Sequence, residues 1–173
     1  MITVIAVRPT GPQDAEQLCQ LQKAAFRPLY EKYHDSSNPY LRGIEDITSR
    51  LDTPQFRYFT ILYDHEIAGG VLYRCIGRTP FCESLPEHEY YLARIYIRPD
   101  LQGRHIARAA ILLCEKYFPD AACFHVDFPQ DLAMNRRCYE SAGFTDTGKR
   151  LETDLGIVLA AYQKTIKSEE APL

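Results

Sequence analysis

The sequence predicts a single α/β domain, residues 1–173, in which helices flank a mixed, mostly antiparallel sheet. Two patterns favour this fold. Segments with the period-two alternation of strands first form a meander, and later alternate with segments of helical period. In addition, 173 residues are typical of one domain with one sizeable core.

The chain begins with a strand-like segment at 2–9, followed by an amphipathic helix that we expect Pro28 to kink or end. The segment 30–43 is polar, aromatic and rich in turn residues, and a short helix within 44–55 should stop at Pro54. The apolar face of the first helix consists of Leu18, Leu21, Ala25 and Leu29.

The segments 57–63 and 66–76 predict a β-hairpin with its turn at Asp64 and His65. Within the hairpin, Gly69 and Gly70 indicate a bulge or a close backbone approach. The aromatic and β-branched segment 89–99 predicts the next strand.

The second half alternates strands and helices. The predicted elements are a helix from 103 with Ile106, Ala110, Leu113 and Tyr117 on its apolar face, a strand at 122–128, a helix capped by Asp131 and stopped by Gly143, and strands at 144–151 and 156–166.

Composition excludes several classes of protein. A formal net charge of −3 argues against a general nucleic-acid binder. No apolar run is long enough to span a membrane, and the N-terminus shows no leader, so we expect a cytoplasmic protein without a membrane partner. The six cysteines form no CxxC pair and lack histidines at ligand spacing, so we expect neither a metal nor disulfides.

The stretch 98–111 raises a question of charge, because Arg104 and Arg108 stand at a predicted helix N-terminus that is already positive. An anion bound by the free N–H groups of the first turn would reverse the effect of these charges. Alternatively, the arginines simply point into solvent. The single Gly103 before the helix matches neither a nucleoside-triphosphate loop nor a dinucleotide fingerprint.

The strand YYLARIYIRP and the turn DLQGRHIARAAI resemble the acyl-CoA-binding segment of the GNAT superfamily of N-acyltransferases. The family pattern is Gln or Arg, two residues, Gly, one residue, then Gly or Ala. His105 stands where the middle glycine is usual, so either the helix starts with ordinary backbone angles and the side chain points away, or the imidazole adds a donor. Gln102 and Ala107 fit the pattern, and the residues that the chain supplies for this segment are Gln102, Gly103, Arg104, His105, Ile106 and Ala107.

A second segment, NRRCYESAGF at 135–144, is similar to the late helix of that family, with Tyr139, Gly143 and Phe144 at the motif positions. The family's asparagine usually lies about two turns before the tyrosine. Here Asn135 lies one turn before Tyr139, on the same helix face, where it could contact CoA.

The resemblance implies a GNAT-like fold and transfer of an acetyl group from acetyl-CoA to a primary amine, by direct attack in a ternary complex. It implies that the strand backbone from Arg94 to Ile97, including Ile95 and Tyr96, pairs with pantetheine. The amide of Ile97 or Ile95 would polarise the thioester carbonyl. Arg108 would join the phosphate turn, and Tyr139 would protonate the leaving thiolate.

The general base is harder to assign, because the strand carries Ala93 where many relatives have a glutamate. Glu89 lies four residues earlier on the same side of the pleat and is the first substitute. The residues Glu83, Glu87 and His88 could act through water, or all of these groups could be solvated. We expect His125 to be a satisfied core histidine.

Tyr30 and Tyr33, with Tyr40, Glu31 and Asp35, could line a pocket for a cationic amine, or they could be the surface of a loop. The acceptor, a small molecule or a peptide amine, stays open. A non-catalytic acyl-CoA sensor is the alternative function, and a nucleotide-binding domain is a weaker one. The sequence leaves the oligomeric state open, a homodimer included.

Overall fold

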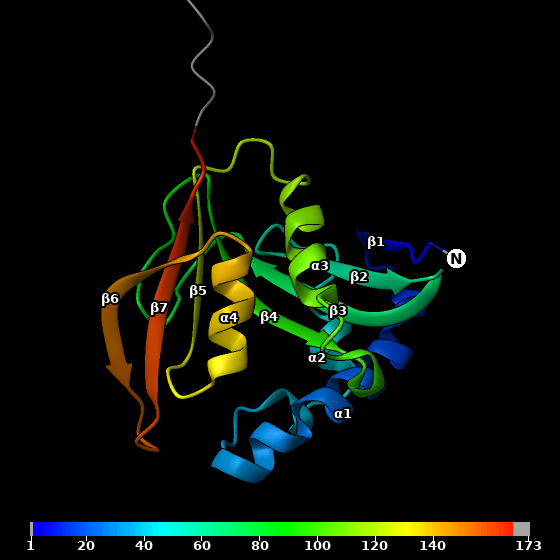
Figure 1. Cartoon of the computed structure of the whole chain (residues 1–173), viewed down its shortest axis with the longest axis horizontal. Coiled ribbons are helices and arrows are strands. Elements are labelled where there is room, and N and C mark those ends of the chain that lie inside the picture. Colours follow the sequence, from blue (N-terminus) through cyan, green and yellow to red (C-terminus); the bar gives the residue numbers. More distant parts are fainter. Residues whose placement is uncertain (1, 168–173) are drawn as a thin grey trace, which may run out of the picture.

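The structure is a computed structural model that describes residues 2–167, and its centre is one sheet of seven strands (Figure 1). The strands are β1 (Ile5–Pro9), β2 (Phe56–Tyr63), β3 (Glu66–Arg74), β4 (Glu89–Ile97), β5 (Cys123–Pro129), β6 (Thr145–Glu152) and β7 (Val158–Thr165). Their order is β1-β2-β3-β4-β5-β7-β6, and every neighbouring pair is antiparallel except β4 with β5. The predicted mixed, mostly antiparallel sheet is thus confirmed.

Helices cover both faces of this sheet. The helices are α1 (Ala15–Tyr33), α2 (Glu45–Thr48), α3 (Ile106–Glu115) and α4 (Ala133–Ser141). One apolar cluster joins α3 and α4 to the sheet, and a second cluster joins α1 and α2 to its other face. In the described part of the chain, no helix is long and apolar enough to cross a membrane.

Within residues 2–167, the only parallel contact in the sheet is between β4 and β5, and it is short. It consists of three residue pairs, from Glu89 with Cys123 to Tyr91 with His125. Beyond these pairs, residues 92–97 of β4 and 126–129 of β5 continue without pairing to each other, and Figure 1 shows the two strands diverging. We call the region between these two diverging segments the strand split.

A β-bulge lies on β4 at the start of the strand split. Tyr73 of β3 pairs with Leu92 and Leu72 pairs with Arg94, so Ala93 has no opposite residue. Ala93 packs in the α1/α2 cluster, and Arg94 faces the same side. There the Arg94 guanidinium bonds to the Asp46 carboxylate of α2 at 2.5 Å, which ties this helix to the bulge.

The predicted hairpin is confirmed in its turn and in its glycines. Asp64 and His65 both have positive φ, 48° and 71°, as a two-residue hairpin turn requires. A Cβ on Gly69 would lie 2.0 Å from the carbonyl oxygen of Tyr96, so the close backbone approach is real and only glycine fits.

Three local predictions are corrected. Of the two outcomes expected at Pro28, an end of helix α1 is excluded, because the helix continues to Tyr33. Helix α3 begins at Ile106 rather than near residue 103, because His105 has a left-handed backbone conformation. Asp131 does not cap α4, since the N-cap residue is Leu132 and the Asp131 carboxylate bonds to α1 instead. Gly143, with φ 100°, does end α4 as predicted.

Candidate active site

The turn between β4 and α3 presents a run of free backbone donors. Among residues 2–167, the N–H groups of the six residues 103–108 have no hydrogen-bond acceptor, whereas the N–H of Ala109 bonds to the His105 carbonyl at 3.2 Å. Gly103 and His105 have φ values of 79° and 60°, which curl the chain just before the helix. A curled backbone leading into a helix N-terminus is a receptor for phosphate groups.

Two of the three arginines of this stretch remain available to an anion. Arg98 is compensated, because it donates to the Asp100 carboxylate at 2.7 Å. Arg104 and Arg108 are exposed, and within the described chain neither lies within ion-pair distance of a carboxylate. Arg104 donates instead to the hydroxyl of Tyr63 at 3.3 Å, and Arg108 to a backbone carbonyl of α4 at 3.1 Å.

The expectation that this helix starts with ordinary backbone angles is wrong. His105 has φ 60° and ψ 20°, the left-handed conformation that glycine adopts most easily. An L-residue in this region costs about 1–2 kcal/mol, so the turn keeps a glycine-like backbone at the expense of some stability. The His105 side chain is exposed.

The edge of β4 that borders the strand split also carries free donors. The Arg98 N–H bonds to the Ala68 carbonyl at 2.7 Å and therefore points to β3. Because backbone groups alternate in direction along an antiparallel strand, the N–H groups of Ile95 and Ile97 point away from β3. The Ile97 carbonyl has the same direction, since it accepts a bond from the Gln102 side chain at 3.1 Å. Both N–H groups thus face the split, where β5 does not pair with them.

Tyr96 does not share this orientation. Its carbonyl lies against Gly69 of β3, and its side chain is buried under α1, where its hydroxyl bonds to that of Tyr58 at 2.7 Å. The structure therefore brings Ile95 and Ile97 to the split, but not the polar groups of Tyr96.

Tyr139 lies on α4 with its ring packed against Phe128 and Phe144. Its hydroxyl forms no hydrogen bond with the described residues. Unlike the Tyr73 hydroxyl, which is fully enclosed without a partner, the Tyr139 hydroxyl is not completely covered by protein. Burial raises the pKa of Tyr139 well above its usual range, and Cys138 and then Asp127 add to this shift. The phenol is therefore neutral near pH 7 and free to donate. Asn135 lies one turn earlier on α4 and is partly buried.

Glu89 lies where β4 and β5 are still paired, two residues before the end of their contact. Its carboxylate is 2.7 Å from Nε2 of His125, so His125 is a satisfied histidine, as expected. The Sγ of Cys123 and the ligand atoms of these two residues lie within 4.8 Å of one another. The hydrogen bond already joins two of the three, and we assign no metal to them. All six cysteines are free thiols.

The sequence analysis missed Asp127, which stands on β5 at the point where the strand split opens. Its carboxylate accepts a bond from the Tyr91 hydroxyl at 2.8 Å. Burial raises the pKa of Asp127 to about 6, although the Tyr91 bond opposes that shift. Asp127 alternates with apolar residues along its strand, which was the one signal in the sequence; its partner on another strand could not be seen there.

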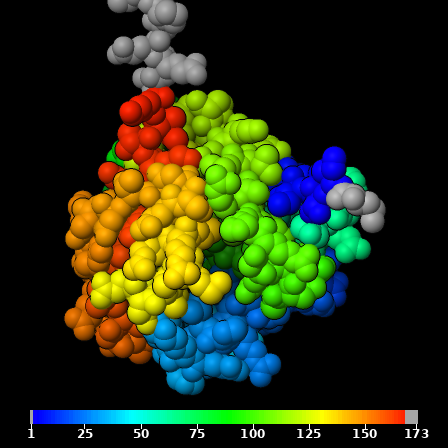
Figure 2. Space-filling model, in the orientation of Figure 1, coloured from blue at the N-terminus to red at the C-terminus, as the bar shows by residue number. Residues whose placement is uncertain are grey.

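The predicted acceptor residues separate into two groups. Tyr33 donates to the Asp131 carboxylate at 2.8 Å and lines a cavity of about 290 Å³ between α1 and the β6–β7 connection. Tyr30 stacks instead on Tyr40, with ring centroids 5.2 Å apart. The two predicted acids, Glu31 and Asp35, bond to Arg27 and Ser37. In Figure 2, the surface is hollowed between α4 and the start of α3, above α1.

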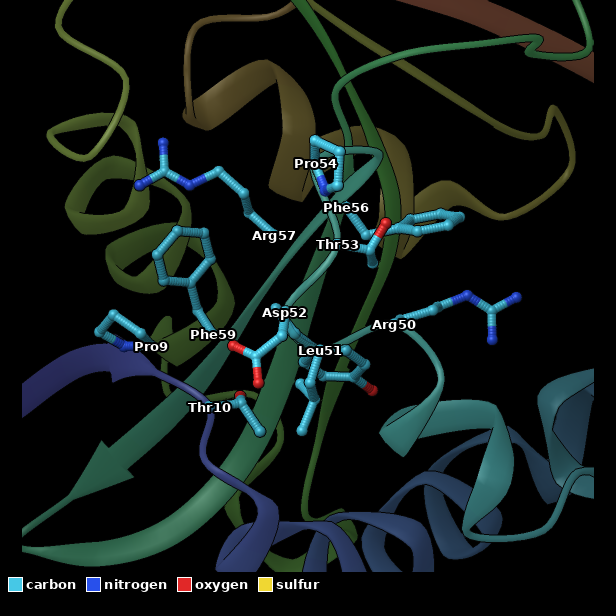
Figure 3. Close-up of a pocket in the computed structure, with 11 residues that line it drawn as sticks. Pro9, Thr10, Arg50, Leu51, Asp52, Thr53, Pro54, Phe56, Arg57 and Phe59 are labelled. Carbon is cyan, nitrogen blue, oxygen red and sulfur yellow. The ribbon is translucent and has the colours of Figure 1, made fainter.

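A further cavity of about 310 Å³ lies elsewhere, beside β1 and β2 and the segment after α2 (Figure 3). Arg50, Asp52 and Arg57 are its charged lining residues. None of the residues at the strand split lines it, and neither does any residue of the turn at 103–108, which we call the donor turn. It is therefore separate from the candidate active site.

The acetyltransferase (GNAT) family model matches residues 15–144, so the chain belongs to this family. Comparison with the curated proteins gives no match.

Solved structures show the same fold at low sequence identity. The ribosomal-protein-S18-alanine N-acetyltransferase from Escherichia coli is 14% identical with a TM-score of 0.69, covering 98% of this chain and 100% of that one. A ribosomal L7/L12 alpha-N-protein acetyltransferase in complex with coenzyme A is 13% identical, with TM-score 0.74 and 94% of each chain covered. AAC(6')-Ib with ribostamycin and coenzyme A is 13% identical, with TM-score 0.73 and 93% of each chain covered.

Proposed function

We propose that this acetyltransferase moves an acetyl group from acetyl-CoA to a primary amine, by direct attack of the amine while both substrates are bound. The observation that carries this proposal is the set of unpaired backbone donors along one path. Ile95 and Ile97 offer N–H groups in the strand split, and the turn at 103–108 offers six more.

The donor turn suits the pyrophosphate of CoA. Six N–H groups, the positive end of α3 and the guanidiniums of Arg104 and Arg108 together complement a multiply charged anion. Gln102 and Asn135 are polar groups beside this path that could contact the rest of the cofactor. Pantetheine amides would pair with the free edge of β4 as a further strand does.

The same edge suits the acyl transfer step. When the amine attacks, negative charge develops on the thioester oxygen, and the Ile95 or Ile97 N–H can stabilise it. The leaving sulfur needs a proton, which the neutral phenol of Tyr139 can supply. No covalent enzyme intermediate is needed, because the amine itself is the nucleophile.

The acceptor would approach through the cavity lined by Tyr33. Its lining combines the Tyr33–Asp131 pair with the apolar residues Leu155, Ile157 and Val158. Lys32 neutralises Asp131 with a bond at 2.8 Å, so the cavity offers little net charge. Peptide amines and small amines both remain candidates, and the structural neighbours named above include a ribosomal-protein-S18-alanine N-acetyltransferase and a protein solved with ribostamycin and coenzyme A.

Turnover with Tyr139→Phe tests the chemistry. Acetyl-CoA and a panel of peptide and small-molecule amines are offered to the wild type, and free thiol is measured. We expect turnover by the wild type and a loss of about 10²-fold or more in the variant, with unchanged acetyl-CoA affinity. Binding without turnover by the wild type on every amine would instead indicate an acyl-CoA sensor.

A further inference from the structure

We propose that Asp127 is the catalytic proton acceptor of this reaction and that Tyr91 is the residue that positions it. The inference rests on the proposed function and adds the general base that the motif positions of the chain do not provide.

The register of β4 and β5 places Asp127 at the opening of the strand split. Tyr91 pairs with His125, so continuing the parallel register by two residues places Asp127 beside Ala93. Ala93 is the bulged residue of β4 at the start of the strand split. Asp127 therefore presents a carboxylate where the split opens, from the strand on its other side.

Around the Asp127 carboxylate, the described residues provide one hydrogen-bond partner and no cation. Among residues 2–167, no Lys, Arg or His nitrogen lies within 4.0 Å of it, so no cation holds it in a structural ion pair. It is only partly exposed and has one protein partner, the Tyr91 hydroxyl. The titratable groups on the elements around Asp127 are Tyr91 on β4, Tyr139 on α4 and the His125–Glu89 pair, in which His125 precedes Asp127 by two residues on β5. Its partner across the sheet on β7 is Ala161, which does not titrate.

These surroundings suit a base. Burial raises the pKa of Asp127 to about 6, so the group is ionised near pH 7 yet basic enough to take a proton. The Tyr91 bond leaves the other carboxylate oxygen, Oδ1, without a protein partner among the described residues. Phe128, the next residue on β5, packs against the ring of Tyr139, so this part of β5 lies beside both the Asp127 carboxylate and the helix that carries the acid.

Glu89 fits the role less well. It lies in the closed part of the β4–β5 contact, and its carboxylate is already bonded to His125. Four residues of strand separate it from Ala93, a distance of about 13 Å. A proton would need a chain of water molecules to reach Glu89 from an amine in the split.

In the proposed acyl transfer, the Asp127 carboxylate takes one proton from the acceptor ammonium, and the freed lone pair on nitrogen forms the C–N bond to the thioester carbon. The C–S bond breaks, the sulfur leaves with the electron pair, and Tyr139 protonates it. The second nitrogen proton returns to the Tyr139 phenolate, and Asp127 releases its proton to solvent. The products are an amide, a thiol and one proton.

The test is the pH dependence of kcat/KM for the amine at saturating acetyl-CoA. In the wild type we expect an acid limb with a midpoint near pH 6, because Asp127 must be ionised. Asp127→Asn should lose this limb and about 10²- to 10⁴-fold in rate at pH 7.5, with unchanged acetyl-CoA affinity. Tyr91→Phe removes a bond that favours the ionised form, so its limb should move to higher pH.

Tyr90→Phe is the matched control, because Tyr90 is the next residue on β4 but its hydroxyl bonds to Asp120, away from the split. Its acid limb should stay in place. Glu89→Gln examines the rival base and should also keep the limb. The proposal is overturned if Asp127→Asn retains the acid limb, or if Glu89→Gln abolishes it.

A second measurement does not depend on turnover, so it separates this proposal from the proposed function. The Asp127 carboxyl is followed by carbon NMR in ¹³C-labelled wild type and Tyr91→Phe as the pH is changed. We expect a midpoint near 6 in the wild type and a higher one in the variant. A midpoint near the usual aspartate value would overturn the assignment even if the enzyme acetylates amines well.

Discussion

Asp127 should reduce the stability of the fold at neutral pH, and Asp127→Asn should therefore stabilise it. Burial raises the pKa of Asp127 from 3.8 to about 6. A carboxyl whose pKa is raised on folding favours the folded state only while it is protonated, so its contribution is lost as the pH rises from about 4 to about 6. This shift of about two pKa units, at about 1.36 kcal/mol per unit, corresponds to about 3 kcal/mol of unfolding free energy.

Urea unfolding of the wild type and Asp127→Asn between pH 4.5 and 8 measures this effect by linear extrapolation. The amide can still accept the Tyr91 bond, so the two proteins should be close in stability at low pH. The advantage of the variant should then grow by about 2 kcal/mol across the range, the part of the 3 kcal/mol that falls within it.

Asp120→Asn is the control for this measurement. Asp120 is exposed, and its bonds to His88 and Tyr90 lower its pKa. Its contribution to stability is lost only as the pH falls below the usual aspartate range, so the difference in unfolding free energy between wild type and Asp120→Asn should stay nearly constant between pH 4.5 and 8. A difference between wild type and Asp127→Asn that does not change with pH would refute the reasoning, because it would mean that Asp127 titrates alike in the folded and unfolded chains.

Two further predictions concern the frame of the site. Arg94→Ala leaves the Asp46 carboxylate with Arg50 as its remaining cation and should cost about 1–3 kcal/mol of unfolding free energy in urea; no measurable loss would show that the α2–bulge tie is unimportant. His105→Gly removes a side chain from a left-handed backbone position and should raise the unfolding free energy in urea by about 1 kcal/mol, with unchanged acetyl-CoA affinity. A loss of affinity would mean that the imidazole contacts the pyrophosphate of CoA.

Local features of the fold could be predicted because their causes lie within a few residues. The turn at Asp64 and His65 and the helix stop at Gly143 each depend on backbone angles that short sequences specify. The donor turn was also visible in its residues. The start of its helix was misjudged because nothing in the sequence shows that His105 takes a left-handed conformation.

Features that depend on distant strands could not be read in this way. The split requires β4 and β5 to pair and then separate, and no local pattern encodes where they part. The bulge at Ala93 depends on the register with β3. Asp127 became a candidate only once its partner Tyr91 was known. The aromatic residues after α1 were grouped by proximity in sequence, yet Tyr30 and Tyr33 contact different partners.

The most direct test of the account is unfolding of the protein with and without acetyl-CoA. A ligand that binds only the folded state at 100 times its Kd adds about 2.7 kcal/mol. We predict this stabilisation for the wild type and for Arg78→Glu/Lys149→Glu, which changes exposed charges away from the turn, but not for Arg104→Glu/Arg108→Glu. No stabilisation of the wild type at millimolar acetyl-CoA would contradict the assignment of the donor turn and the strand split as the cofactor site.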